Sequence, residues 1–131
     1  MTEAELRGLV TRECTRLGLL WHWCRDSRVC EGNRGLPDLV ILGRGGILLA
    51  ELKGPDGETS ADQDKWLWHA WAASIPWAIW RPSDWDKGAI QRRLANLISR
   101  LSSGTLVYGC LCSAWCKLAS ASYASRAYTP R

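Results

Sequence analysis

The sequence predicts an α/β domain in which one mixed β-sheet is flanked by helices. The chain has 131 residues, of which 47% are hydrophobic, so it is long and apolar enough for one domain with a buried core. Segments with helical spacing and short runs of branched or aromatic residues follow the order helix, three strands, helix, strand, helix. That order favours a single sheet with helices packed on it.

The first helix and the first strand precede a polar loop. Thr2 and Glu5 form a capping-box pattern, apolar residues then repeat at helical spacing, and Gly18 is a suitable end for the helix. Residues 19–24 are predicted to form a strand. Residues 25–36 contain Asp, Ser, Asn and Gly, which predicts a loop that leads into the next strand.

Two apolar runs, residues 38–42 and 47–51, predict a β-hairpin. The four residues between them include three glycines, which fits a tight turn. Pairing the runs about the middle of this turn places Asp38 opposite Glu51 on one face of the sheet, with Cβ atoms roughly 5 Å apart. Lys53 lies two residues beyond Glu51 and points to the same face.

The second half of the chain predicts a helix, a short strand and a last helix. Ser60 and Gln63 form another capping-box pattern, which starts a helix that ends near residue 74. Residues 77–80 are predicted to form a strand, and a last helix capped by Ser83 is expected from residue 84 to about residue 101. One stripe of the middle helix is predicted to be buried: Gln63, Leu67, Trp71 and Ile75.

The facing carboxylates of Asp38 and Glu51 predict a cation site. Like charges directly opposite each other destabilise a sheet, and Mg²⁺ prefers hard oxygen ligands with a small number of carboxylates. A lysine beside such a site, here Lys53, can orient or deprotonate a water or neutralise charge on a phosphate. The alternative is an exposed hairpin end with an ordinary alternation of Glu and Lys.

Charge is distributed unevenly along the chain. Residues 1–86 carry 10 basic and 13 acidic side chains, whereas residues 87–131 carry 7 basic and no acidic side chains. The basic part can neutralise phosphates, although a solubilising helix face with a basic tail gives the same pattern. Charge alone therefore leaves the partner open.

The remaining composition favours an intracellular protein. No apolar stretch reaches the roughly 20 residues of a membrane span, and the first residues lack the basic and apolar regions of a secretory signal. We therefore expect a cytoplasmic protein, in the host cell if it is viral, whose six cysteines are mostly reduced thiols. A zinc site is the alternative for one cluster, although no histidine lies near it in sequence: Cys110, Cys112 and Cys116.

Four motifs in order resemble the VRR-NUC family of virus-type replication and repair nucleases, within the PD-(D/E)xK nuclease superfamily. The resemblance covers about residues 2–101 and implies a restriction-endonuclease-like αβββαβ core, with a nuclease domain at 1–103. Residues 104–131 depart from the family pattern and form a tail of unknown structure. The motifs are GLPDLVIL at 35–42, LAELKG at 49–54, Ser60 and Gln63 ahead of Trp66-Leu67, and Trp80-Arg81-Pro82.

The resemblance implies a metal-dependent phosphodiesterase that uses Mg²⁺ or Mn²⁺. Asp38 and Glu51 match the acidic metal ligands of the family, and the backbone carbonyl of Leu52 is the usual third protein ligand. Lys53 matches the catalytic lysine, which would position the attacking water and balance charge in the transition state.

Two helical positions match the family but also have a capping role. Gln63 matches the glutamine that orients the lysine or the scissile phosphate, with capping of its own helix as the alternative. Counted back from Gly18, Glu5 is the best match to a first-helix glutamate that joins the metal ligands, ahead of Glu13 and Glu3. The capping box is the competing role of Glu5.

The resemblance implies DNA as the substrate, in a phage or bacterial setting. Small single-domain relatives resemble Holliday-junction resolvases that act as homodimers, so branched DNA is the expected form in replication, repair or recombination. A restriction-type or general nuclease with the same site, and a non-catalytic DNA-binding module on the same fold, are the alternatives. Five arginines are candidate phosphate contacts: Arg25, Arg28 and Arg34 in the loop, and Arg92 and Arg93 in the last helix.

Overall fold

The computed structural model describes residues 1–24 and 30–99 and confirms the α/β class, with one mixed sheet flanked by helices. Residues 104–131, predicted to form a separate tail, lie outside the described residues. No helix within the described ranges is long and apolar enough to cross a membrane. The elements are α1 (Glu3–Arg16), β1 (Leu20–Trp23), β2 (Leu39–Gly43), β3 (Gly46–Leu52), α2 (Ala61–Ala72), β4 (Trp77–Trp80), α3 (Pro82–Asp86) and α4 (Ala89–Ala95).

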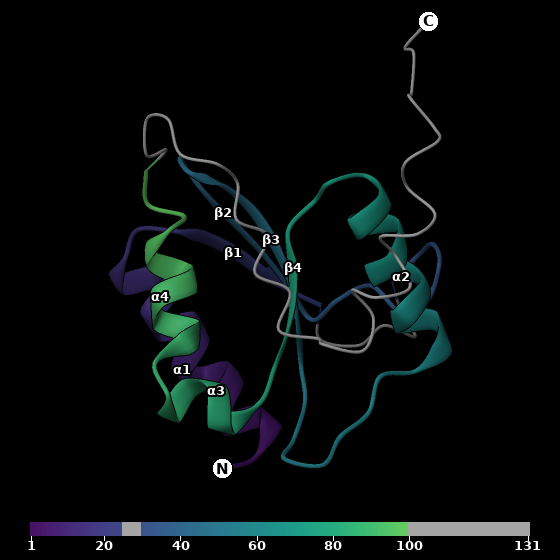
Figure 1. The fold of residues 1–131 in the computed structure, drawn as a ribbon, viewed down its shortest axis with the longest axis horizontal. Coiled ribbons are helices and arrows are strands. Elements are labelled where there is room, and N and C mark those ends of the chain that lie inside the picture. The colour runs from purple at the N-terminus through teal and green to yellow at the C-terminus, as the bar shows by residue number, and fades with distance from the viewer. Residues whose placement is uncertain (25–29, 100–131) are drawn as a thin grey trace, which may run out of the picture.

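The four strands lie in sequence order across the sheet. The pairs β1–β2 and β2–β3 are antiparallel, and β3–β4 is parallel, with α2 as the crossover between them. Figure 1 shows the sheet nearly edge-on, with α1, α3 and α4 on one side and α2 on the other. The sheet is therefore the middle of three layers, and its two faces have different helical neighbours.

The main hydrophobic core lies on the α1 side of the sheet. Alternate residues of β2 and β3 are directed into it because side chains of a strand point to opposite faces in turn. The helices contribute their apolar stripes, including the predicted stripe of α1. The fully buried members are Leu6, Val10 and Cys14 from α1, Leu39, Ile41, Leu48, Ala50 and Leu52 from the hairpin, and Ile90 and Leu94 from α4.

The hairpin has the predicted register. Leu39 pairs with Ala50, and Gly43 pairs with Gly46 next to the turn. The turn glycines also allow a close approach of the chain that follows α4: a Cβ on Gly43 would lie 2.0 Å from the carbonyl oxygen of Leu97. Continued by one residue, the same register sets Asp38 opposite Glu51.

The prediction of one long last helix is wrong. The segment forms two short helices, α3 and α4, because Gly88 between them has a left-handed backbone with φ of 69°. Pro82 rather than Asp84 is the first helical residue, and the Asp84 carboxylate accepts a hydrogen bond from the Arg81 amide at 2.8 Å. A left-handed residue interrupts a right-handed helix, and glycine adopts this conformation at little cost, so the helix is divided at Gly88.

The predicted buried stripe of α2 is only partly correct. Leu67 is buried, but Trp71 is 39% exposed and Ala70 is buried in its place. A spacing of four residues turns about 40° further around a helix at each step. Residues spaced by four over several turns therefore drift around the helix. The later ones, such as Trp71, no longer lie on the side of α2 that packs against the sheet.

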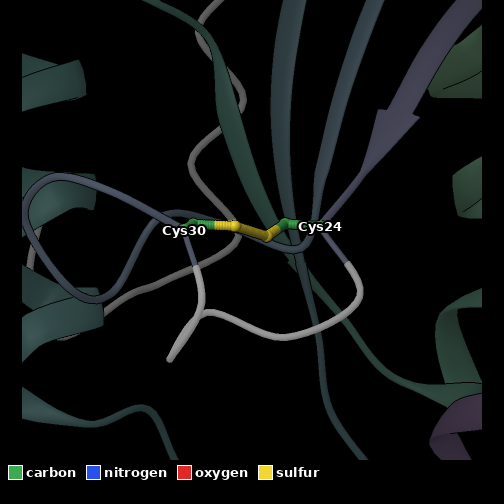
Figure 2. The surroundings of a disulfide bond; sticks show 2 residues. All are labelled: Cys24 and Cys30. Atoms are coloured by element: carbon green, nitrogen blue, oxygen red, sulfur yellow. A yellow bond between two sulfur atoms is a disulfide. The ribbon is translucent and has the colours of Figure 1, made fainter.

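Cys24 and Cys30 form a disulfide, six residues apart in sequence (Figure 2). This pair is an exception to the expectation that most of the six cysteines are reduced, because the end of β1 and the segment leading to β2 bring the two sulfurs together. Cys14 is a free, buried thiol, and its burial raises the pKa to about 11. Cys110, Cys112 and Cys116, considered as zinc ligands, lie outside the described residues.

Candidate functional site

Asp38, Glu51 and Lys53 meet where β2 begins and β3 ends. Asp38 directly precedes β2, and Lys53 directly follows β3. The Oδ2 atom of Asp38 accepts a hydrogen bond from the Leu52 amide at 2.8 Å, which joins the two strand ends. The hairpin thus brings together residues that are more than a dozen positions apart, as its register predicted.

Glu51 is the one buried charged residue among the described positions, with 1% of its surface exposed. Its Oε1 atom lies 2.9 Å from Lys53 Nζ and also accepts a hydrogen bond from the side-chain nitrogen Nε2 of Gln63. Its Oε2 atom is buried and has no hydrogen-bond partner within the described part of the chain. An unpaired buried carboxylate oxygen is costly, so this atom is open to a cation or a proton.

Gln63 connects the first turn of α2 to the strand residues. Its Oε1 atom accepts hydrogen bonds from Lys53 Nζ at 3.0 Å and from the Ser60 amide at 2.9 Å. The Ser60 hydroxyl accepts in return from the Gln63 amide, which completes the capping box. The Gln63 side chain therefore caps α2 and contacts Lys53 at the same time.

Burial dominates the electrostatics of the carboxylate pair. It raises the pKa of Glu51 to about 7, with the nearby Asp38 charge acting in the same direction and the hydrogen bond from Lys53 opposing both. Burial also raises the pKa of Asp38, against the Leu52 amide and the charges of Lys53 and Arg7. Both groups thus hold a proton more strongly than free carboxyls, because burial disfavours the charged form of each.

The segment before Asp38 is packed against the start of α2. The Trp66 indole donates a hydrogen bond to the Arg34 carbonyl at 2.8 Å. Gly35 has φ of 90°, and a Cβ there would lie 2.3 Å from the Asp62 carbonyl carbon. Any larger residue at position 35 would push this segment away from α2, so the two contacts help to place Asp38 near Gln63.

Glu5 does not join the carboxylate pair. Its Oε2 atom accepts hydrogen bonds from the Thr2 amide at 2.6 Å and the Thr2 hydroxyl at 2.9 Å, and these bonds lower its pKa. Across residues 1–24 and 30–99, no group of three His, Cys, Asp or Glu side chains is arranged to hold a metal ion. The structure therefore supports the capping role of Glu5, and its metal ligation stays a prediction, as does that of the Leu52 carbonyl.

The predicted arginine contacts are scattered. Arg25 and Arg28 lie outside the described residues, and Arg34 is exposed next to the segment that leads to Asp38. Arg92 and Arg93 are on α4, on the opposite side of the sheet from α2 (Figure 1). Arg34 alone of these five is thus seen near the elements that carry the site.

Arg7 was missed by the sequence reasoning. It lies on α1, its guanidinium carbon is 3.8 Å from the centroid of the Trp23 ring, and its charge acts on Asp38. The sequence spacing of α1 does not distinguish Arg7 from the other arginines of that helix. Only the pairing of β1 with β2 brings its stacking partner beside the start of β2.

The site therefore combines two facing carboxylates, a lysine held by one of them, and an amide that contacts both the lysine and the buried carboxylate. A divalent cation fits this donor set, because hard carboxylate oxygens are its preferred ligands and one of them has no partner among the described residues. Comparison of the chain with protein-family models, with curated proteins and with solved structures finds no match.

Proposed function

We propose that the protein is a metal-dependent nuclease of the VRR-NUC type that hydrolyses phosphodiester bonds in DNA. The observation that carries this proposal is Glu51: a buried carboxylate opposite Asp38 that contacts Lys53 and Gln63 and leaves one oxygen without a partner among the described residues. Burying a carboxylate in this way lowers the stability of the fold, and such destabilising groups are found mainly at catalytic sites.

Asp38 and Glu51 are the residues that would hold the cation, with the Leu52 carbonyl as the third protein ligand. A bound Mg²⁺ or Mn²⁺ would supply positive charge that polarises a phosphate oxygen and lowers the pKa of a water. The donor set agrees with this choice, since both side chains offer hard oxygen atoms. The hydrogen bond from the Leu52 amide fixes one oxygen of Asp38 and so orients its carboxylate.

Lys53 is the residue that acts on the reacting groups. Its side chain is only 14% exposed, and its ammonium lies between Glu51 and Gln63, at 2.9 and 3.0 Å, which restricts it to one position. A fixed cation there can hold the attacking water and stabilise the negative charge that develops on the phosphate. Gln63 contributes by orienting Lys53, because its amide oxygen accepts one of the ammonium protons.

A non-catalytic DNA-binding module on the same fold is the competing function. Surface arginines and lysines suffice for binding to phosphates, whereas two facing carboxylates repel phosphates. The cost of burying Glu51 therefore favours the nuclease.

The test compares wild-type protein with Lys53→Ala on labelled single-stranded, duplex, flap and four-way DNA. We expect wild-type cleavage that needs Mg²⁺ or Mn²⁺ and stops in EDTA, and a loss of at least about 100-fold in Lys53→Ala. Lys65→Ala, which removes an exposed lysine from α2, is the matched control and should retain activity. Full cleavage by Lys53→Ala, or cleavage in EDTA, would rule the site out.

The same experiment addresses the form of the substrate. We propose branched DNA, in particular a four-way junction, cut by a homodimer because a junction needs two symmetric cuts. Preferential cleavage of the four-way substrate and a dimer mass in light scattering would support this form. Equal cleavage of all substrates would instead indicate a general nuclease.

A further inference from the structure

Helix α1 brings an arginine, Arg7, to the start of β2. The Arg7 guanidinium is stacked on the ring of Trp23, with 3.8 Å between its central carbon and the ring centroid. Trp23 is the last residue of β1 and pairs with Leu39, so its side chain lies on the α1 side of the sheet, whereas Asp38, the residue before Leu39, lies opposite Glu51 on the α2 side. Arg7 is half-buried, so one part of it is packed and another part remains in contact with solvent.

Stacking holds the guanidinium but leaves its hydrogen-bond donors available. The five N–H donors lie in the guanidinium plane, and an aromatic ring against the face of that plane occupies none of them. Within residues 1–24 and 30–99, Arg7 has no hydrogen bond or ion pair through its side chain.

The charges of the site also favour a positively charged side chain near the start of β2. Two facing carboxylates repel an approaching phosphate, and Lys53 is already engaged with Glu51 and Gln63. The side chain of Glu5, the acidic candidate on α1, is held by Thr2 in the capping box. Among the side chains of α1, Arg7 is the one whose charge acts on Asp38.

We propose that Arg7 binds a phosphate group of the DNA backbone at the start of β2, on the α1 side of the sheet and next to Asp38, an inference that rests on the proposed nuclease function. The planar fork of a guanidinium matches two phosphate oxygens, and charge-assisted pairs of this kind are strong. Trp23 limits the rotation of the guanidinium and so lowers the entropy that binding would cost.

The experiment measures binding separately from cleavage. Anisotropy of fluorescein-labelled duplex and four-way DNA is recorded in EDTA over a range of salt concentrations, and kcat and KM are measured with Mg²⁺. The variants are Arg7→Ala, Arg7→Lys and the matched control Arg12→Ala, which removes an exposed arginine from the same helix. Circular dichroism confirms that each variant is folded, and Arg7→Lys serves for the comparison if Arg7→Ala is not.

Arg7→Ala should weaken DNA binding about tenfold, as expected for loss of a hydrogen-bonded charge. The slope of log affinity against log salt should fall by about 0.9 on duplex DNA. KM should rise more than kcat falls. Arg7→Lys should keep most of the salt slope but lose part of the affinity, because it keeps the charge without the planar fork. Arg12→Ala should resemble wild type.

Other outcomes separate the two proposals. If wild type cleaves DNA and Arg7→Ala behaves like Arg12→Ala, the role of Arg7 is wrong and the nuclease stands. If wild type binds DNA without cutting it, the nuclease fails, while the salt slope still decides whether Arg7 contacts phosphate. If wild type neither binds nor cuts, both proposals fail.

Discussion

Glu51 is the residue at which stability and function are most directly opposed. It is buried, one of its oxygens has no partner among the described residues, and burial raises its pKa to about 7. The folded chain without a cation therefore holds a proton on Glu51 at a pH where the unfolded chain has released it. The same carboxylate becomes a good cation ligand only when that proton leaves.

The free energy of unfolding should consequently fall as pH rises from about 4.5 to about 7 in EDTA. In this range the folded state binds more protons at Glu51 than the unfolded state, whose carboxyl has the ordinary pKa of 4.5. The loss amounts to roughly 3 kcal/mol for a shift of this size. Asp38, whose pKa is also raised by burial, acts in the same direction.

Urea denaturation at pH 5 and pH 8 checks this expectation. Glu51→Gln should remove most of the pH dependence, since a neutral amide does not titrate. Glu58→Gln, at an exposed position, is the control and should keep the wild-type dependence. An unchanged pH dependence in Glu51→Gln would show that other groups cause it.

At the scale of elements, the contact between the segment before β2 and the start of α2 sets the geometry of the site. Gly35 touches the α2 backbone, and Trp66 donates a hydrogen bond to the Arg34 carbonyl. These contacts join the element that carries Asp38 to the element that carries Gln63. A change at Gly35 should therefore affect both stability and activity.

Gly35→Ala should destabilise the protein by at least about 2 kcal/mol, because it adds backbone strain at φ of 90° and a clash with α2. Cleavage should fall as well. Gly32→Ala is the matched control: its φ is 117°, but a Cβ there meets nothing within 4 Å. Thermal denaturation and kcat/KM measure the two effects, and equal losses in both variants would show that strain alone is responsible.

At the scale of the whole molecule, the fold creates the carboxylate pair. Asp38 and Glu51 belong to different strands, and the packing of α1 and α4 on one face and α2 on the other holds those strands in register (Figure 1). The unfolded chain has no such pair. A cation that binds it must therefore stabilise the folded state.

Mg²⁺ or Mn²⁺ should raise the melting temperature of the wild-type protein, by a stabilisation of about 2.7 kcal/mol at a cation concentration 100 times the dissociation constant. Differential scanning fluorimetry at pH 8 measures the shift. Asp38→Asn should lose it, whereas Glu58→Gln should keep it. A shift of equal size in Asp38→Asn would place the cation elsewhere.

Much of the fold and the centre of the site followed from local rules. Capping boxes at Thr2 and Ser60 marked the starts of two helices, and alternation with a glycine turn determined which residues of the hairpin face each other. Because period-two alternation leaves few registers that bury one face, the Asp38–Glu51 pair and the position of Lys53 could be predicted. These features depend on residues close together in the chain.

Other features depended on packing between distant segments, and the sequence could not show them. The left-handed Gly88 divides a segment whose apolar spacing is that of one helix. The stacking of Arg7 on Trp23 requires α1 to pack against β1, and the contact between Gln63 and Glu51 requires α2 to lie over the end of β3. Local sequence patterns were sufficient to predict the hairpin and the positions of its charged residues. The burial of Glu51 and the stacking of Arg7 on Trp23 arise only when the helices pack against the sheet.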